Sequence, residues 1–174
     1  MSYDHLNQDL IKTGSYINGE YLAPSGDVFD ITNPANGEVI CQLHNATAED
    51  AKTAVAAAAT AMPEWRAKSV RHRAKVMRRW FDLCTQHRAD LAAILTAEQG
   101  KPLAEAAGEI AYGSSYLEWY GEEAKRVYGD TVPGASGNSR IVLIKQPVGV
   151  VAAITPWNFP NAMLARKVAA AVAA

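Results

Sequence analysis

The chain has 174 residues, of which 49% are hydrophobic and 20% are charged, a composition typical of a globular domain and unlike that of a disordered or collagen-like chain. Seventeen basic and eighteen acidic residues give a formal net charge of −1, which does not indicate a nucleic-acid or acidic-lipid partner. Two cysteines are too few for a disulfide framework, the N-terminus lacks a signal-peptide pattern, and no apolar run approaches the roughly 20 residues that span a bilayer. We therefore expect a cytoplasmic protein with no membrane-spanning segment.

Turn signals divide the first part of the chain into short stretches. They are Asn18-Gly19, Pro24-Ser25-Gly26 and residues 33–37 (Asn-Pro-Ala-Asn-Gly). Residues 28–31 and 38–40, which lie between turns, contain valine, isoleucine and phenylalanine, residue types that favour strands. This part of the chain therefore predicts small strands and hairpins.

Two helical patterns follow. A capping-box sequence at Thr47 (Thr-Ala-Glu-Asp) opens an alanine-rich stretch, which we expect to be helical as far as Ala61 because Pro63 follows. Ser69 opens a longer pattern in which apolar residues recur at spacings of three and four. We expect this pattern to break near His87 and then to resume.

Glycine and proline delimit the next elements. Gly100 is a natural helix stop, and Pro102 suits the first turn of another helix, which we expect to end at Gly129. Residues 130–139 are rich in Gly, Pro and Ser, which predicts a connection, and residues 140–145 form a β-prone run flanked by charge. That run predicts an edge or protruding strand.

Residues 148–154 are continuously apolar without alternation, which predicts a parallel strand buried on both faces. From Pro160 the pattern becomes helical, and the chain ends at Ala174 with no glycine cap, no basic last turn and no polar tail. A buried parallel strand needs neighbouring strands, and none follows in the sequence. We therefore expect the chain to be the N-terminal part of something longer.

The turn between the expected strand and the last helix is the best candidate for chemistry. It reads Thr155-Pro156-Trp157-Asn158-Phe159-Pro160 and lies at the carboxyl end of a strand, where open α/β sheets bind ligands. An asparagine fixed between prolines can donate its amide N–H to charge developing on a substrate oxygen. In the alternative interpretation, which the pattern alone favours, Asn158 bonds to backbone and Trp157 packs in the core. No Gly-x-Gly-x-x-Gly fingerprint follows the strand.

Six motifs, taken together and in order, resemble the aldehyde dehydrogenase superfamily from about Tyr16 to the last residue. They are Tyr16-Ile17-Asn18-Gly19-Glu20, Asn33-Pro34-Ala35-Asn36-Gly37-Glu38, Glu98-Gln99-Gly100-Lys101-Pro102, Glu118-Trp119-Tyr120 with Tyr128-Gly129-Asp130, Gln146-Pro147-Val148-Gly149-Val150 and Pro156-Trp157-Asn158-Phe159-Pro160. The details most resemble the succinate-semialdehyde branch of that superfamily.

The resemblance implies an α/β fold, the N-terminal part of the aldehyde dehydrogenase fold, in which helices precede a parallel sheet. Residues 1–130 and 148–174 would form an incomplete Rossmann-like dinucleotide-binding domain. Residues 131–147 would form an oligomerisation segment, and the catalytic domain would be absent from this chain.

The resemblance also implies roles for individual residues. Asn158 would be the side-chain half of the oxyanion hole, and Thr155, Pro156 and Trp157 would line the nicotinamide side of the cofactor site together with Asn158. Arg166 would bind the distal carboxylate of the substrate, because a guanidinium can hold a carboxylate in a bidentate pair. Without the resemblance, a solvated helix residue would be the favoured interpretation of Arg166.

The implied activity is oxidation of succinate semialdehyde, or a similar semialdehyde, to the carboxylic acid with NAD or NADP. The full-length protein would bind a small-molecule aldehyde and form a homo-oligomer. The family's nucleophilic cysteine, general-base glutamate and cofactor-binding lysine lie beyond the position matched by Ala174, and Cys41 and Cys84 are expected to be small core residues. The alternative is a catalytically incomplete fragment that acts only as a binding or assembly element, or a remnant without function.

A basic run near Trp65 and Trp80 could indicate nucleic-acid binding. Helical spacing spreads its charges over a solvent face, and acidic residues elsewhere cancel them, so a solvated helix is favoured and we predict no nucleic-acid partner. The run contains Arg66, Lys68, Arg71, Arg73, Lys75, Arg78 and Arg79.

The sequence contains three weaker patterns. Cys84 and His87 are three residues apart, but no second pair completes a metal site, so we assign no metal. Four aromatic residues at helical spacing are predicted to face the core rather than a ligand. They are Tyr112, Tyr116, Trp119 and Tyr120. Three acidic residues lack a partner that would place a reacting atom between them, which favours surface or capping roles. They are Glu98, Glu105 and Glu109.

Overall fold

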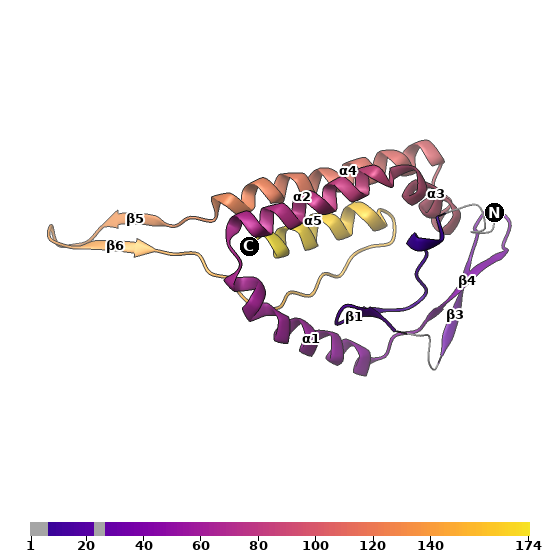
Figure 1. Ribbon diagram of the computed structural model, residues 1–174, viewed down its shortest axis with the longest axis horizontal. Coiled ribbons are helices and arrows are strands. Elements are labelled where there is room, and N and C mark those ends of the chain that lie inside the picture. The colour runs from indigo at the N-terminus through magenta and orange to yellow at the C-terminus, as the bar shows by residue number, and fades with distance from the viewer. Residues whose placement is uncertain (1–6, 23–26) are drawn as a thin grey trace.

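Helices form most of the computed structural model, which describes residues 7–22 and 27–174. In chain order the elements are η2 (Gln8–Leu10), β1 (Tyr16–Ile17), β2 (Glu20–Tyr21), β3 (Val28–Thr32), β4 (Val39–His44), α1 (Ala48–Ala67), α2 (Val70–Gln86), α3 (Arg88–Gln99), α4 (Leu103–Glu123), η3 (Ala124–Arg126), β5 (Asp130–Pro133), β6 (Arg140–Leu143) and α5 (Pro160–Ala173). Figure 1 shows α2, α4 and α5 side by side, with the β5–β6 hairpin extending from one end and β3–β4 lying at the other. Within the described residues, no helix is long and apolar enough to cross a membrane.

The core lies where α2, α4 and α5 meet. Met77, Leu117 and Ala169, one from each helix, are almost completely buried and form one cluster. The face that α5 buries consists of alanines at spacings of three and four, which lets the helix approach α4 closely. They are Ala162, Ala165, Ala169 and Ala173.

A glycine of α4 allows the close approach of the first turn of α5. A Cβ built on Gly113 would lie 2.0 Å from Oδ1 of Asn161 and 3.2 Å from Cα of Ala162. Both distances are shorter than a van der Waals contact between such atoms. Any larger residue at position 113 would therefore push the first turn of α5 away from α4.

The last turn of α5 is held by side chains of α1 and α2. The indole Nε1 of Trp65 donates to the carbonyl of Val172 at 3.0 Å, and Nε of Arg73 donates to the carbonyl of Ala173 at 3.3 Å. A positive charge at this end also complements the partial negative charge of the helix carbonyls. Arg73 is buried, so the prediction that the basic residues of this run are solvated is wrong for Arg73.

The predicted hairpins near the N-terminus are confirmed. β1 and β2 are joined by Asn18 and Gly19, whose φ angles are 54° and 86°, as a tight hairpin turn requires. β3 pairs with β4 in antiparallel register, with Phe29 opposite Leu43. The predicted turn at residues 24–26 lies outside the described residues.

The predicted helix starts are also confirmed. The hydroxyl of Thr47 accepts from the backbone N–H of Asp50 at 3.2 Å, and the Asp50 carboxylate accepts from the N–H of Thr47 at 2.7 Å. These hydrogen bonds lower the pKa of Asp50 to about 2. Ser69 caps α2, His87 separates α2 from α3, and Gly100, with φ of 78°, ends α3 in the left-handed conformation.

The prediction that the first helix stops at Ala61 is wrong, because α1 continues through Pro63 to Ala67. Pro63 removes one intrahelical hydrogen bond. The turn that follows is held from outside by the hydrogen bond between Trp65 and Val172. This tertiary contact could not be seen in the local sequence.

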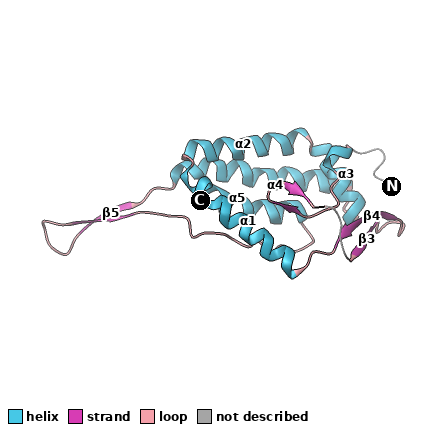
Figure 2. Ribbon diagram, turned by 60° about the horizontal axis from the view of Figure 1, so that its bottom comes forward, coloured by secondary structure: helices cyan, strands magenta, loops and turns pink. Residues whose placement is uncertain are grey.

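The β5–β6 hairpin projects from the helices (Figure 2) and is exposed along both strands. The strand predicted at residues 140–145 is confirmed as β6, whereas residues 130–139, predicted as a connection, contain β5. The predicted helix end at Gly129 is also wrong, because α4 gives way to η3 after Glu123. A Cβ on Gly129 would lie 1.7 Å from the carbonyl oxygen of Leu143, so this glycine allows the hairpin strands to come together rather than capping a helix.

The buried parallel strand predicted at residues 148–154 is not formed. The segment is extended but belongs to no sheet, and Val148 and Ile154 are 95% and 85% exposed. In Figure 1 it runs between α1 and the other helices. A strand is stabilised by a ladder of hydrogen bonds to a neighbour, and the described residues provide no strand that pairs with it.

Candidate functional site

The candidate turn lies between the extended segment and α5. Pro160 is the first residue of α5, as its fixed φ favours, and the carbonyl of Phe159 accepts the first hydrogen bond of the helix from Met163 at 2.9 Å. Trp157 is 79% exposed, so the alternative prediction that it packs in the core is wrong. Asn158 is exposed as well, and its side chain is free to meet a ligand.

The backbone of Asn158 is anchored although its side chain is exposed. Its carbonyl oxygen accepts from Nζ of Lys101 at 3.0 Å and from Nε2 of Gln99 at 3.3 Å. The Lys101 ammonium also lies 3.9 Å from the centre of the Phe159 ring, within range of a cation–π interaction. The connection between α3 and α4 therefore fixes the position of the turn.

Lys101 forms an ion pair with Glu109 of α4. The other carboxylate oxygen of Glu109 accepts from the backbone N–H groups of Asn161 and Ala162 at 2.9 Å and 3.3 Å. A carboxylate at this place complements the positive end of the helix dipole. The capping role predicted for Glu109 is confirmed, although the helix that it caps is α5 and not its own.

The contribution of Glu109 to the site was not foreseen, but the sequence contained a signal for it. Glu109 lies three residues after Ala106 and four before Gly113, so helical spacing places it on the buried face of α4. A charged residue on such a face needs a partner. By contrast, Glu98 and Glu105 are exposed, as the surface interpretation predicts.

Arg166 is exposed on α5, eight residues after Asn158. Its guanidinium lies 5.5 Å from the centre of the Tyr116 ring, and Nη1 is 3.5 Å from Sδ of Met163. No carboxylate of the described residues forms an ion pair with it. An anionic ligand could therefore reach this guanidinium without displacing an internal partner.

The prediction that the aromatic residues of α4 face the core is wrong for most of them. Tyr112 and Trp119 are 46% and 64% exposed, and they line an open depression together with Tyr116. Only Tyr120 packs against the cluster around Met77. Apart from Glu109, the buried face of α4 is made of smaller residues at the same helical spacing, so spacing alone could not identify the inward face. They are Ala106, Ile110, Gly113, Ser114, Leu117 and Gly121.

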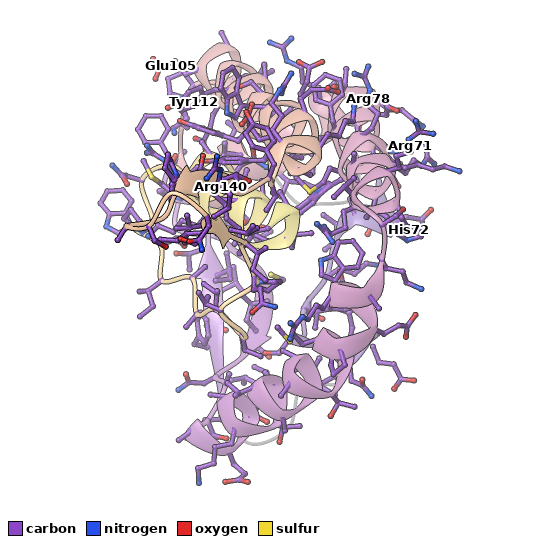
Figure 3. All side chains as sticks on the ribbon, turned by 90° about the vertical axis from the view of Figure 1, so that its left-hand side faces the viewer. Arg71, His72, Arg78, Glu105, Tyr112 and Arg140 are labelled. Carbon is purple, nitrogen blue, oxygen red and sulfur yellow. The ribbon has the colours of Figure 1, made fainter. Side chains whose placement is uncertain are left out.

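Two tyrosines of this depression share a hydrogen bond. The hydroxyl oxygens of Tyr112 and Tyr116 are 2.5 Å apart. This bond raises the pKa of Tyr116, and the nearby Arg166 opposes the change. In Figure 3, Tyr112 and Arg78 of α2 are labelled at opposite sides of the view, but the depression reaches the basic surface of α2, because Glu118, which lines the depression, forms an ion pair with Arg78 at 3.2 Å.

The cysteines do not contribute to the site. Cys84 is half-buried beside the Met77 cluster, and burial raises the pKa of its thiol, as expected for a small core residue. Cys41 packs against Ala97. Within residues 7–22 and 27–174, no group of three or more histidine, cysteine, aspartate or glutamate side chains is placed to hold a metal ion.

The chain matches a known protein family over most of its length. Residues 21–174 match the aldehyde dehydrogenase family, and the chain belongs to that family. This confirms the resemblance seen in the sequence motifs, and the chain has the N-terminal portion of the aldehyde dehydrogenase fold.

Individual relatives are closely similar. The chain is 50% identical over 169 residues to a succinate-semialdehyde dehydrogenase of Escherichia coli K12 whose name specifies NADP(+). The aligned region covers 97% of this chain and 35% of the relative. It is 52% identical over 166 residues to a glutarate-semialdehyde dehydrogenase of Pseudomonas aeruginosa, which covers 95% and 34%. The crystal structure of succinate-semialdehyde dehydrogenase from Burkholderia pseudomallei superposes with a TM-score of 0.93 at 50% identity, covering 96% of this chain and 35% of that one. The chain therefore spans about a third of the length of these relatives.

Proposed function

We propose that the complete protein carrying this chain oxidises succinate semialdehyde, or a semialdehyde of similar length, to the dicarboxylic acid with NAD or NADP as the oxidant. The observation that carries the proposal is the placement of Asn158 and Arg166 on one continuous element, the anchored turn and α5. Relatives named for succinate and glutarate semialdehydes support the substrate class.

In this proposal Asn158 donates its side-chain N–H to the aldehyde oxygen as negative charge develops there. A donor held in place before the reaction stabilises this charge without reorganisation. Arg166 binds the distal carboxylate of the same substrate. The exposed guanidinium, with no internal carboxylate partner among the described residues, is suited to this role.

Thr155, Pro156 and Trp157 would line the cofactor site together with Asn158, as part of a dinucleotide-binding domain formed by residues 1–130 and 148–174. The fit rests on Trp157, because an indole exposed on a proline-bounded turn offers a flat face to a planar ring. The nicotinamide cofactor supplies the hydride acceptor when bound. The turn residues of this chain hold the nicotinamide ring and exclude water from the side of the ring that they cover.

Residues 131–147 would take part in a homo-oligomer. Four consecutive apolar residues of this segment are between 49% and 72% exposed, and the strand edges of the hairpin have no partner among the described residues. Exposed apolar strand edges pair readily with another chain. The residues are Ile141, Val142, Leu143 and Ile144.

The test compares the complete protein with its Arg166→Met variant on succinate semialdehyde and on a neutral aldehyde of equal carbon number. Hydrogen bonds to charged groups contribute about 1.5–3 kcal/mol, so kcat/KM for succinate semialdehyde should fall about 10- to 10²-fold. The value for the neutral aldehyde should stay unchanged. Arg71→Met, which alters an exposed arginine of α2 (Figure 3), is the matched control. Equal losses on both aldehydes would overturn the role of Arg166.

A second candidate, assembly without turnover, is favoured by the exposed apolar side chains of Val148, Ile154 and β6. Contiguous apolar surface marks interaction sites. This candidate predicts that the purified protein self-associates but reduces neither NAD nor NADP with succinate semialdehyde. Turnover in that assay would exclude it.

A further inference from the structure

Lys101 and Glu109 form the most deeply buried ion pair of the described residues. The side chain of Lys101 is 10% exposed and that of Glu109 is 1% exposed. Apart from their mutual contact, the hydrogen bonds of both side chains go to one short stretch of backbone, residues 158–162.

The pair holds this stretch from two sides. Lys101 donates to the carbonyl of Asn158 and lies against the ring of Phe159. Glu109 accepts from the N–H groups of Asn161 and Ala162. The last residue of the turn and the first turn of α5 are therefore held by two side chains that also bind each other.

Stability alone does not account for such a pair. Desolvation of two charges cancels much of their attraction, so an apolar pair of the same volume is often as stabilising or more so. The hydrogen bonds of the pair are directional, however, and they fix the backbone of Asn158 while its side chain remains exposed. A misplacement of about 1 Å can lower a reaction rate about 10²-fold.

We propose that Lys101 and Glu109 are positioning residues for Asn158, which rests on the proposed oxyanion role of that side chain. The ion pair holds the carbonyl of Asn158 and the amides of α5 so that the Asn158 amide points at the aldehyde oxygen. The pair touches neither substrate nor cofactor. Its effect on the reaction passes through Asn158.

A double-mutant cycle in the complete enzyme tests this inference. Lys101→Met with Glu109→Gln removes both charges, avoids an unpaired buried charge, and leaves an amide oxygen that can still accept from the α5 N–H groups. Asn158→Ala removes the proposed donor. The Lys101/Glu109 change and Asn158→Ala are measured separately and together. The rate of the first turnover with succinate semialdehyde is followed by the absorbance of the reduced cofactor.

We expect Asn158→Ala to slow the first turnover about 10²- to 10³-fold and the Lys101/Glu109 change to slow it about 10²-fold. In the Asn158→Ala background the Lys101/Glu109 change should have less than about a twofold further effect, because its target is gone. KM for succinate semialdehyde should change little, since Arg166 is retained. The single variant Lys101→Arg, which keeps a cation beside Glu109, should retain most of the rate of the native enzyme.

Each outcome decides one question. If the Lys101/Glu109 change slows the reaction equally in both backgrounds, or not at all in the native one, the positioning role is overturned while the proposed function stands. If Asn158→Ala leaves the rate unchanged, the oxyanion role itself fails. Lys101→Leu with Glu109→Gln, which also leaves no unpaired buried charge, repeats the cycle should the first double variant not fold. Lys52→Met, at an exposed ion pair of α1, is the matched control.

Discussion

Replacement of Gly113 by alanine separates a steric effect from a helix-propensity effect. A Cβ at this position would lie 2.0 Å from Oδ1 and 3.1 Å from Cγ of Asn161, and 3.2 Å from Cα of Ala162. The Asn161 side chain can rotate, but the Ala162 backbone can move only if the first turn of α5 moves. Gly108 of the same helix is the control, because a Cβ there would have no neighbour within 4 Å.

The magnitude follows from two opposing contributions. Replacement of glycine by alanine within a helix stabilises the folded protein by about 1 kcal/mol, and this gain applies to both positions. Overpacking costs about 1–3 kcal/mol and applies only at position 113. Gly108→Ala should therefore be stabilising, and Gly113→Ala should be less stable than Gly108→Ala by about 1–3 kcal/mol, the overpacking cost itself.

Urea unfolding of the complete protein and of both variants, followed by tryptophan fluorescence, measures the difference at equal m-values. The Gly113→Ala variant should also turn over more slowly, because the displaced residues are those whose amides Glu109 holds. Equal stability of the two alanine variants would refute the conclusion that α4 and α5 meet at Gly113 with no space for a methyl group.

Three further predictions concern single positions. Met77→Ala, at a completely buried side chain, should destabilise by about 2–5 kcal/mol in denaturant unfolding. Gly100→Ala should lower the melting temperature, because the position has φ of 78° and a Cβ would lie 2.8 Å from Cγ of Pro34. The pKa of Asp50 falls on folding from 3.8 to about 2, so its contribution is present above pH 3.8 and is lost as the pH falls through about 2. Asp50→Asn should remove this part of the acid dependence of stability.

Each of these has its own control. Val76→Ala alters an exposed apolar side chain of α2 and should cost far less than Met77→Ala. Gly37→Ala is the control for Gly100→Ala, because Gly37 has φ of 75° but a Cβ there would meet no atom within 4 Å. Comparison of the two variants separates the effect of backbone strain from that of the contact with Pro34. An unchanged acid dependence in the Asp50→Asn variant would show that the capping box does not account for it.

Much of the fold could be predicted because its signals are local. The capping box at Thr47, the N-cap at Ser69 and the left-handed glycine at Gly100 each act within one helical turn. Composition and flanking charge alone predict the protruding strand at residues 140–145. These elements need no distant contact to form.

The errors have one physical origin, which is dependence on distant parts of the molecule. The extension of α1 past Pro63 depends on a hydrogen bond from Trp65 to α5. The predicted strand at residues 148–154 has the right composition, but the part of the chain that the structure describes contains no strand that pairs with it. The tyrosines of α4 have the spacing of a core stripe, but the alanines of α5 pack on the other face of that helix.

Local reasoning accounts for the turn of the candidate site but not for what holds it. The rigid turn around Asn158 could be recognised from its prolines. What holds its backbone could not, since Lys101 and Glu109 are 57 and 52 residues away from the groups that they bind. A charged residue on an apolar helix face, such as Glu109, is a signal that such a distant partner exists.

The fastening of α5 at both ends has a consequence for substrate length. Glu109 holds its first amides, and Trp65 and Arg73 hold its last carbonyls, so sliding of the helix along its axis or rotation about it would break these hydrogen bonds. From Pro160 to Arg166 the separation is then set by helix geometry, about 1.5 Å per residue, and Asn158 in the preceding turn is held through its carbonyl by Lys101, so the placement of two domains relative to each other does not set the distance. If both residues hold the substrate as proposed, the distance between them within this segment determines which semialdehyde length is preferred. Domain motions elsewhere in the protein would leave that distance unchanged.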